Sequence, residues 1–118
     1  IQAVAPLMRG QGGGTNVNVS SGTTRRLPVG IGPYAATKAA LNTVTDVARA
    51  ELADDGIAVS LVIPSITATE FHSVLRAGAA HIDGLPKSPP SDVAEAILRA
   101  IETAEPEISV WPKGSRPR

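Results

Sequence analysis

The chain has 118 residues, of which 42% are hydrophobic and 19% are charged, so we expect one packed domain rather than a disordered chain. Eleven basic residues balance eleven acidic ones, which leaves neither the basic surface of a nucleic-acid-binding protein nor a polybasic membrane signal. Cysteine is absent, which excludes disulfides, thiolate metal sites and a cysteine nucleophile. No apolar run reaches the length of a membrane span. We expect a cytoplasmic protein without nucleic-acid, membrane or metal partners.

The first part of the chain predicts a helix, a turn and a strand. Ile1–Gly10 carries apolar residues at helical spacing and ends at a glycine. Residues 11–14 are rich in glycine, and Thr15–Ser21 alternates Val17 and Val19 with polar residues, as a short strand does. A phosphate-binding glycine loop follows a strand and opens a helix, whereas this cluster follows a helix. We therefore interpret it as a connecting turn.

The longest predicted helix covers Pro33–Asp55, after a loop at Gly22–Gly32. Proline suits a first helical turn, and Gly56 suits the position just beyond the end. The apolar stripe that we expect to face the core is formed by Ala40, Leu41, Val44, Val47, Ala48 and Leu52. The nearly continuous apolar run Ile57–Ile63 is typical of a parallel strand covered on both faces, and Pro64 is expected to end it.

The last third of the chain predicts further alternation of helix and strand. A short helix is expected over Phe71–Ala80, a second amphipathic helix over Asp92–Ala104 and a strand over Glu107–Val110. The second helix should turn one apolar face to the core, with Val93, Ala94, Ile97, Leu98 and Ile101. Residues 111–118 form a basic tail that we expect to be loose.

Alternating helices and strands predict an α/β fold with a parallel sheet. Two or three strands make a thin sheet, and single α/β domains often reach roughly 200–250 residues. The chain also begins without methionine, inside a predicted helix. We therefore expect residues 1–110 to be the C-terminal part of one larger domain.

Residues suited to proton transfer follow the predicted strands. Tyr34 and Lys38 are four positions apart at the start of the long helix, so they lie on one face about a turn apart. An ammonium close to a phenol favours the phenolate and suits the pair to acid–base chemistry near neutral pH. Ser21 ends the first strand and Pro64–Thr69 follows the second. The carboxyl ends of parallel strands are where such sheets bind ligands, so these segments should converge.

Three segments together resemble the second half of the short-chain dehydrogenase/reductase family. They read Gly-Gly-Gly-Thr-Asn-Val-Asn-Val-Ser-Ser at 12–21, Tyr-Ala-Ala-Thr-Lys at 34–38 and Ile-Ala-Val-Ser-Leu-Val-Ile-Pro-Ser-Ile-Thr-Ala-Thr at 57–69. The Tyr-x-x-x-Lys pattern is weak alone, but the second serine lies thirteen residues before the tyrosine, as in the family. The resemblance covers roughly residues 1–110 and implies a Rossmann-type, doubly wound parallel sheet.

The resemblance implies an NAD(P)-dependent oxidoreductase that interconverts an alcohol and a carbonyl. Tyr34 would be the general acid or base, Lys38 would bind the nicotinamide ribose and favour the phenolate, and Ser21 would hold the substrate oxygen. Ser20 is the rival serine, and the spacing favours Ser21. The residues implied in binding NAD or NADP are Tyr34, Lys38, Pro64, Ser65, Ile66, Thr67 and Thr69.

The sequence departs from the family pattern in three ways. Ser65 stands where the family usually has glycine, and the family's glycine loop and catalytic asparagine are not in this chain. We therefore expect the 118 residues alone to be inactive, and the choice between NAD and NADP stays open. Two alternatives remain. One is an extended-type epimerase or dehydratase, which the short tail after Val110 disfavours. The other is a non-catalytic truncated remnant.

Two further expectations concern partners. The resemblance implies a homodimer or homotetramer formed through helix 33–55, whose alanine-rich side permits close packing. In the family, the region corresponding to Phe71–Leu85 covers the substrate. Its apolar residues here suggest that the substrate is a moderately apolar small molecule.

Arg25 and Arg26 are interpreted as a solvated loop pair, with contact to an anionic substrate as the alternative.

Overall fold

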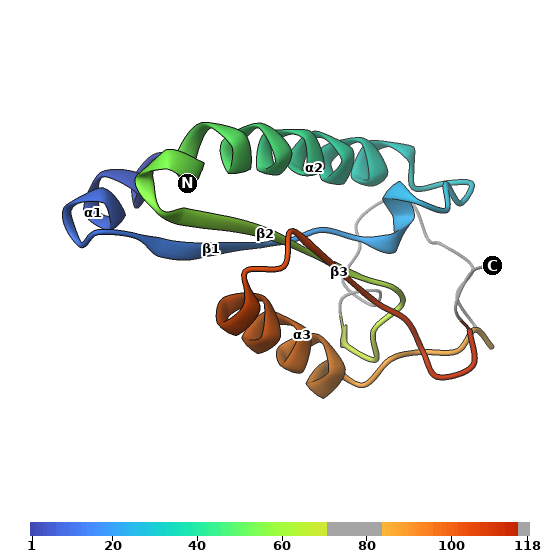
Figure 1. The fold of residues 1–118 in the computed structure, drawn as a ribbon. Helices are drawn as coiled ribbons and strands as arrows, with labels where there is room; N and C mark the ends of the chain where they lie inside the picture. The colour runs from blue at the N-terminus through green and yellow to red at the C-terminus, as the bar shows by residue number, and fades with distance from the viewer. Residues whose placement is uncertain (71–83, 116–118) are drawn as a thin grey trace.

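The computed structural model describes residues 1–70 and 84–115, and in them a parallel sheet lies between two helices. The strand order is β1-β2-β3. Helix α2 covers one face and α3 the other (Figure 1). The elements in chain order are α1 (Ala5–Gly10), β1 (Gly14–Val19), the 3-10 helix η1 (Gly22–Thr24), α2 (Gly32–Leu52), the 3-10 helix η2 (Ala53–Asp55), β2 (Ile57–Pro64), α3 (Pro90–Thr103) and β3 (Glu107–Val110). The predicted α/β fold with a doubly wound parallel sheet is confirmed.

Most predicted elements are present with small shifts at their ends. Helix α2 and η2 together end at Asp55, as predicted, and Gly56 follows in the left-handed conformation at φ 68°. Strand β1 is shorter than predicted, because the Ser21 side chain accepts a hydrogen bond from the Thr23 amide and turns the chain into η1. Helix α1 begins at Ala5 rather than at Ile1. The helix predicted over Phe71–Ala80 lies outside the described residues.

The core lies on both sides of β2, the central strand. Val59, Leu61, Val62 and Ile63 are at most 2% exposed. Val59 packs in a cluster with residues of α2, whereas Val62 packs in a cluster with residues of α3 and β3. Burial on both faces explains why this strand is apolar at nearly every position, since neither face meets water.

The face that α2 turns to the sheet differs from the predicted one. Thr45 is fully buried, whereas Val44 and Val47 are 56% and 50% exposed and Ala40 is also exposed, so the predicted stripe is wrong at these three positions. The reason lies in β1, where Asn18 Nδ2 donates to Thr45 Oγ1 at 2.9 Å. The Thr45 hydroxyl in turn donates to the Leu41 carbonyl at 2.7 Å. The buried hydroxyl therefore both accepts and donates a hydrogen bond.

Helix α3 contacts the sheet through small residues. Ala96 and Ala100 are buried, and Val93 and Ile97 pack beside them. The predicted apolar face is therefore wrong at Ala94, Leu98 and Ile101, which are exposed.

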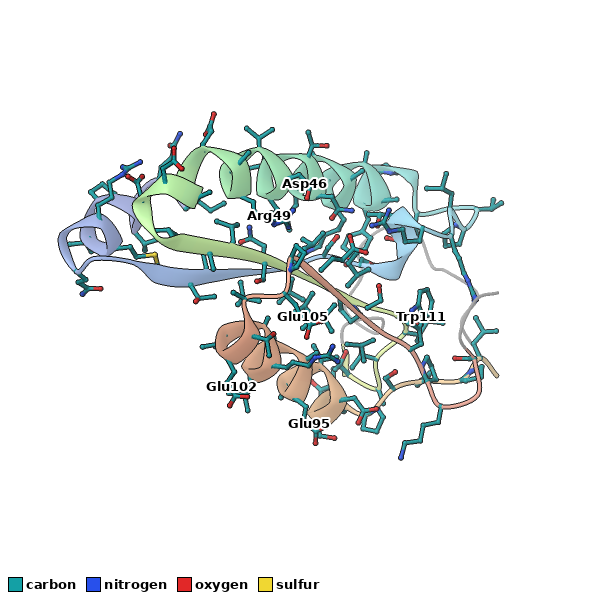
Figure 2. All side chains as sticks on the ribbon, viewed as in Figure 1. Asp46, Arg49, Glu95, Glu102, Glu105 and Trp111 are labelled. Atoms are coloured by element: carbon teal, nitrogen blue, oxygen red, sulfur yellow. The ribbon has the colours of Figure 1, made fainter. Side chains whose placement is uncertain are left out.

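Glu95 and Glu102 of α3 point away from the sheet (Figure 2). Arg99 of α3 donates two hydrogen bonds of 2.7 Å to Glu105, which follows the helix, and holds the pKa of that carboxyl below its ordinary value.

The turns at the amino ends of β1 and β2 lie against each other. A side-chain carbon on Gly13 would stand 2.6 Å from the Gly56 carbonyl oxygen, closer than such atoms can approach, and Gly13 has φ 138°. Arg9 and Asp55 form an ion pair of 2.6 Å beside this contact. Glycine at position 13 is therefore required both by the close approach and by the backbone conformation.

Candidate functional site

The carboxyl ends of β1 and β2 meet the start of α2 at one end of the sheet (Figure 1). A side-chain carbon on Gly22 would lie 3.3 Å from both the Pro64 carbonyl oxygen and Ser65 Cα, so the chain after β1 runs directly against the chain after β2. The structure thus brings the segment with Ser21 and the segment that begins at Pro64 to the same edge.

Tyr34 and Lys38 occupy the first turns of α2, and both are half-buried. Lys38 Nζ lies 5.9 Å from the centre of the Tyr34 ring, at the outer range of a cation–π contact. The same ammonium donates to the carbonyl of Val19, the last residue of β1, at 3.1 Å. Lys38 therefore links the tyrosine to the end of the strand that precedes Ser21. An ammonium has three hydrogens, so two are left after the bond to Val19.

The two adjacent serines have different surroundings. Ser20 is 3% exposed and its hydroxyl donates to Asn42 Oδ1. Ser21 is half-buried, and its Oγ accepts hydrogen bonds from the Thr23 amide at 3.3 Å and the Thr23 hydroxyl at 3.0 Å. In both bonds Ser21 is the acceptor, so neither uses its own hydroxyl hydrogen. Only Ser21 thus combines solvent access with a hydrogen to donate.

The segment after β2 is held by hydrogen bonds of its backbone. The Ser65 amide donates to the Val110 carbonyl at 2.9 Å, and Thr67 pairs with Ser88 in a parallel bridge. Ser88 is fully buried, and its hydroxyl has no hydrogen-bond partner within the described residues. Ile66 and Thr67 are half-buried, whereas Thr69 is exposed. These bonds fix the segment beside the end of β3.

The loop after η1 is tied to the last strand and the residues after it. Arg25 forms an ion pair of 2.7 Å with Glu107, and both side chains are exposed. The Arg26 guanidinium lies 5.1 Å from the centre of the Trp111 ring, within cation–π range. Both arginines therefore have protein partners, which the sequence pattern did not indicate.

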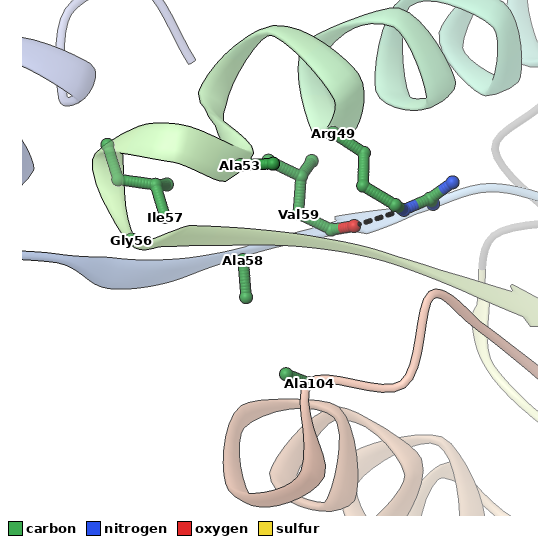
Figure 3. A pocket seen from close by; sticks show the side chains of 7 residues that line it. All are labelled: Arg49, Ala53, Gly56, Ile57, Ala58, Val59 and Ala104. Carbon is green, nitrogen blue, oxygen red and sulfur yellow. Dashed lines mark hydrogen bonds between the residues drawn. The ribbon is translucent and has the colours of Figure 1, made fainter.

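Two shallow hollows lie away from this edge. One, of about 300 Å³, is lined by residues at the amino end of β2 and around it. There Arg49 donates to the Val59 carbonyl at 2.7 Å (Figure 3). It also donates to the Pro106 carbonyl at 2.7 Å and to Asp46. The other, of about 270 Å³, lies between α3 and β3. Neither is lined by Ser21, Tyr34 or Lys38. Arg49 instead fastens α2 to the sheet, because two of its N–H groups bond to the carbonyls of Val59 in β2 and of Pro106 just before β3.

Two further features bear on ligands and membranes. In residues 1–70 and 84–115, no three or more histidine, acidic or cysteine side chains are grouped so that they could hold a metal ion. No helix in the same part of the chain is long and apolar enough to cross a membrane.

The fold defines the class of this protein. A parallel sheet covered on both faces by helices, with polar residues gathered where the strands end, is a Rossmann-type α/β fold. Residues 1–80 match the family model of the short chain dehydrogenases. The chain therefore belongs to the short-chain dehydrogenase/reductase family.

Relatives of known sequence agree with this family. The chain is 32% identical over 130 residues to an uncharacterised oxidoreductase of Schizosaccharomyces pombe, covering 97% of this chain and 54% of the relative. It is 43% identical over 75 residues to dehydrogenase/reductase SDR family member 4 of Rattus norvegicus, covering 64% of this chain and 27% of that protein. The chain thus spans about half the length of the S. pombe relative, and its match to the rat protein covers 27% of that protein.

Solved structures share the fold. A short-chain dehydrogenase from Sphingobium yanoikuyae in complex with NADPH superposes with a TM-score of 0.79 at 28% identity, covering 92% of this chain and 41% of that one. A gluconate 5-dehydrogenase from Burkholderia cenocepacia in complex with NADP and tartrate gives a TM-score of 0.78 at 26% identity, covering 92% and 48%.

Proposed function

We propose that this chain is the C-terminal part of an NAD(P)-dependent oxidoreductase that interconverts an alcohol and a carbonyl. Residues 1–110 would belong to a single Rossmann-type domain and residues 111–118 to a basic tail. The observation that carries the proposal is the position of Lys38, which contacts the Tyr34 ring and the end of the strand that precedes Ser21. The complexes of the structural neighbours with NADPH and NADP support the cofactor. We expect the 118 residues alone to be inactive.

Three side chains would share the proton chemistry. The Ser21 hydroxyl would donate a hydrogen bond to the substrate oxygen, since its two bonds to Thr23 leave its hydrogen available. The Tyr34 hydroxyl would give a proton to that oxygen in reduction and take it back in oxidation. When bound, the nicotinamide supplies or accepts the hydride. Lys38 would stabilise the phenolate through its positive charge.

The residues at this edge fit a nicotinamide nucleotide. The two ammonium hydrogens of Lys38 that remain suit the hydroxyl oxygens of a ribose. Pro64, Ser65, Ile66, Thr67 and Thr69 would hold the nicotinamide side of the cofactor, from a segment whose backbone is fixed by the Val110 carbonyl and by Ser88. This rigidity supports a binding role, because an ordered segment loses less entropy when a ligand binds.

Deuterium transfer tests the proposed reaction. The full-length protein would be incubated with acetophenone or ethyl acetoacetate and with NADPH or NADH in which both hydrogens at C4 of the nicotinamide are replaced by deuterium. We expect deuterium at the carbinol carbon of the product, measured by mass spectrometry. An epimerase would show no net consumption of the nucleotide. A remnant that only binds would change the fluorescence of the nucleotide without transferring its label. Either result would contradict the proposal.

We also propose that the full-length protein forms a homodimer or homotetramer through α2. The outer face of this helix exposes Val44 and Val47 beside the exposed Ala36 and Ala40, a surface that allows two helices to approach closely. Val47→Glu should lower the mass measured by light scattering at micromolar concentration. Leu98→Glu, on the outer face of α3, should leave the pairing through α2 in place. A wild-type protein that is monomeric under these conditions would refute the proposal.

A further inference from the structure

Tyr34, Lys38 and Asn42 are spaced four residues apart in α2, so they lie along one side of the helix. Asn42 has no part in the reaction proposed above. Its side-chain amide bonds to two segments outside the helix. Oδ1 accepts from the hydroxyl of Ser20, and Nδ2 donates to the hydroxyl of Thr24 at 3.2 Å. Asn42 therefore connects the residue before Ser21 with a residue three positions after it.

The chain of hydrogen bonds returns to Ser21 itself. The Thr24 hydroxyl donates to the Ser21 carbonyl oxygen at 2.9 Å, and the Thr24 amide donates to the same oxygen at 3.1 Å. Each hydroxyl in the chain donates one hydrogen, so all of its bonds can form at once. Ser20 is 3% exposed, so water does not compete for its bond to Asn42. The Ser21 hydroxyl takes no part and stays available.

We propose that Asn42 is a positioning residue for Ser21. It holds the turn of residues 20–24 against α2, the helix that carries Tyr34 and Lys38. It acts through Ser20 and Thr24, and its effect on turnover rests on the proposed function. Since a displacement of about 1 Å between reacting groups can cost up to about 100-fold in rate, loosening this turn should slow the reaction without weakening the binding of the nucleotide.

Kinetics of the full-length protein test the proposal, with NADPH or NADH and whichever of acetophenone and ethyl acetoacetate it reduces. Asn42→Ala should lower kcat per nucleotide-binding site by about 10- to 100-fold and change the Kd of the nucleotide less than about twofold.

Asn42→Asp keeps the acceptor for Ser20 but loses the donor to Thr24. It should match Thr24→Val, whereas Thr24→Ser keeps the hydroxyl and should retain kcat. The matched control is Thr43→Val, since among the described residues the Thr43 hydroxyl bonds only within its own helix, to Ala39.

The double variant Asn42→Ala/Thr24→Val separates positioning from general damage. If both residues act through one chain of bonds, the double variant should be no slower than the worse single variant. Three results would overturn the proposal. The losses in kcat of the two single variants could multiply in the double variant, or Asn42→Ala could leave kcat unchanged. The third is a loss in kcat that is fully explained by a smaller fraction of folded protein.

Amide hydrogen exchange gives a readout that needs no turnover. In Asn42→Ala, the amides of Thr24, Arg25 and Arg26, which bond to the carbonyls of Ser21 and Gly22, should exchange about tenfold faster or more. The amides of β2 should be unaffected. If the wild-type protein transfers no hydride, the proposed function fails. The amide hydrogen exchange still tests whether Asn42 anchors the turn of residues 20–24 to α2. Unchanged exchange in these three amides would refute the anchoring itself.

Discussion

Replacing Tyr34 with phenylalanine in the full-length protein should lower kcat by about 10³-fold, the typical contribution of a positioned general acid or base. The Kd of the nicotinamide nucleotide should change less than about twofold, because the ring that faces the Lys38 ammonium at 5.9 Å is retained. Turnover with saturating nucleotide gives kcat, and the change in nucleotide fluorescence on binding gives Kd.

Thr37→Val is the matched control for this substitution. It removes a hydroxyl from the same helical turn. Thr37 is exposed, and within the part of the chain that the structure describes its Oγ1 donates only to the backbone carbonyl of Tyr34, at 2.7 Å. Its kcat should stay within about twofold of the wild type, since a single exposed local hydrogen bond contributes little. If Tyr34→Phe keeps most of its turnover, the acid–base role of Tyr34 is wrong. If both variants lose turnover equally, the loss reflects damage to the helix start.

Gly13→Ala should destabilise the full-length protein by about 3 kcal/mol or more. The added carbon would lie 2.6 Å from the Gly56 carbonyl oxygen, so the two turns must move apart, and φ 138° is unfavourable for any residue with a side chain. Urea unfolding of the wild type and the variant gives the difference in free energy.

The neighbouring Gly12 offers a control for the same substitution. It also has a positive φ, 82°, but a side-chain carbon there would meet no heavy atom within 4 Å. Gly12→Ala should therefore cost only the backbone strain, about 1–2 kcal/mol. Equal costs at the two positions would show that the contact with Gly56 contributes nothing, contrary to the structure.

The periodicity of the sequence was sufficient to predict the order and type of the described α-helices and strands, but the 3-10 helix η1 lies in the segment predicted as a loop. The apolar run Ile57–Ile63, interrupted only by Ser60, identified the central strand, because a strand buried on both faces is apolar at nearly every position. Pro33 and Gly56 located the ends of the long helix within a residue, because their backbone preferences are local. The positions of Ser21 and Pro64–Thr69 at the ends of the two predicted strands indicated one edge of the sheet, since parallel strands end together.

Which faces pack, and which polar groups pair, was decided only by the tertiary structure. Periodicity shows that a helix has an apolar side, but the side that contacts the sheet depends on the strand beneath it. Here Asn18 in β1 bonds to Thr45, and Ser20 just after β1 bonds to Asn42, so polar residues are buried beneath α2 while Val47 is exposed. These partners lie more than twenty positions apart in the chain. No local pattern records them, because they meet only when the helix packs on the sheet.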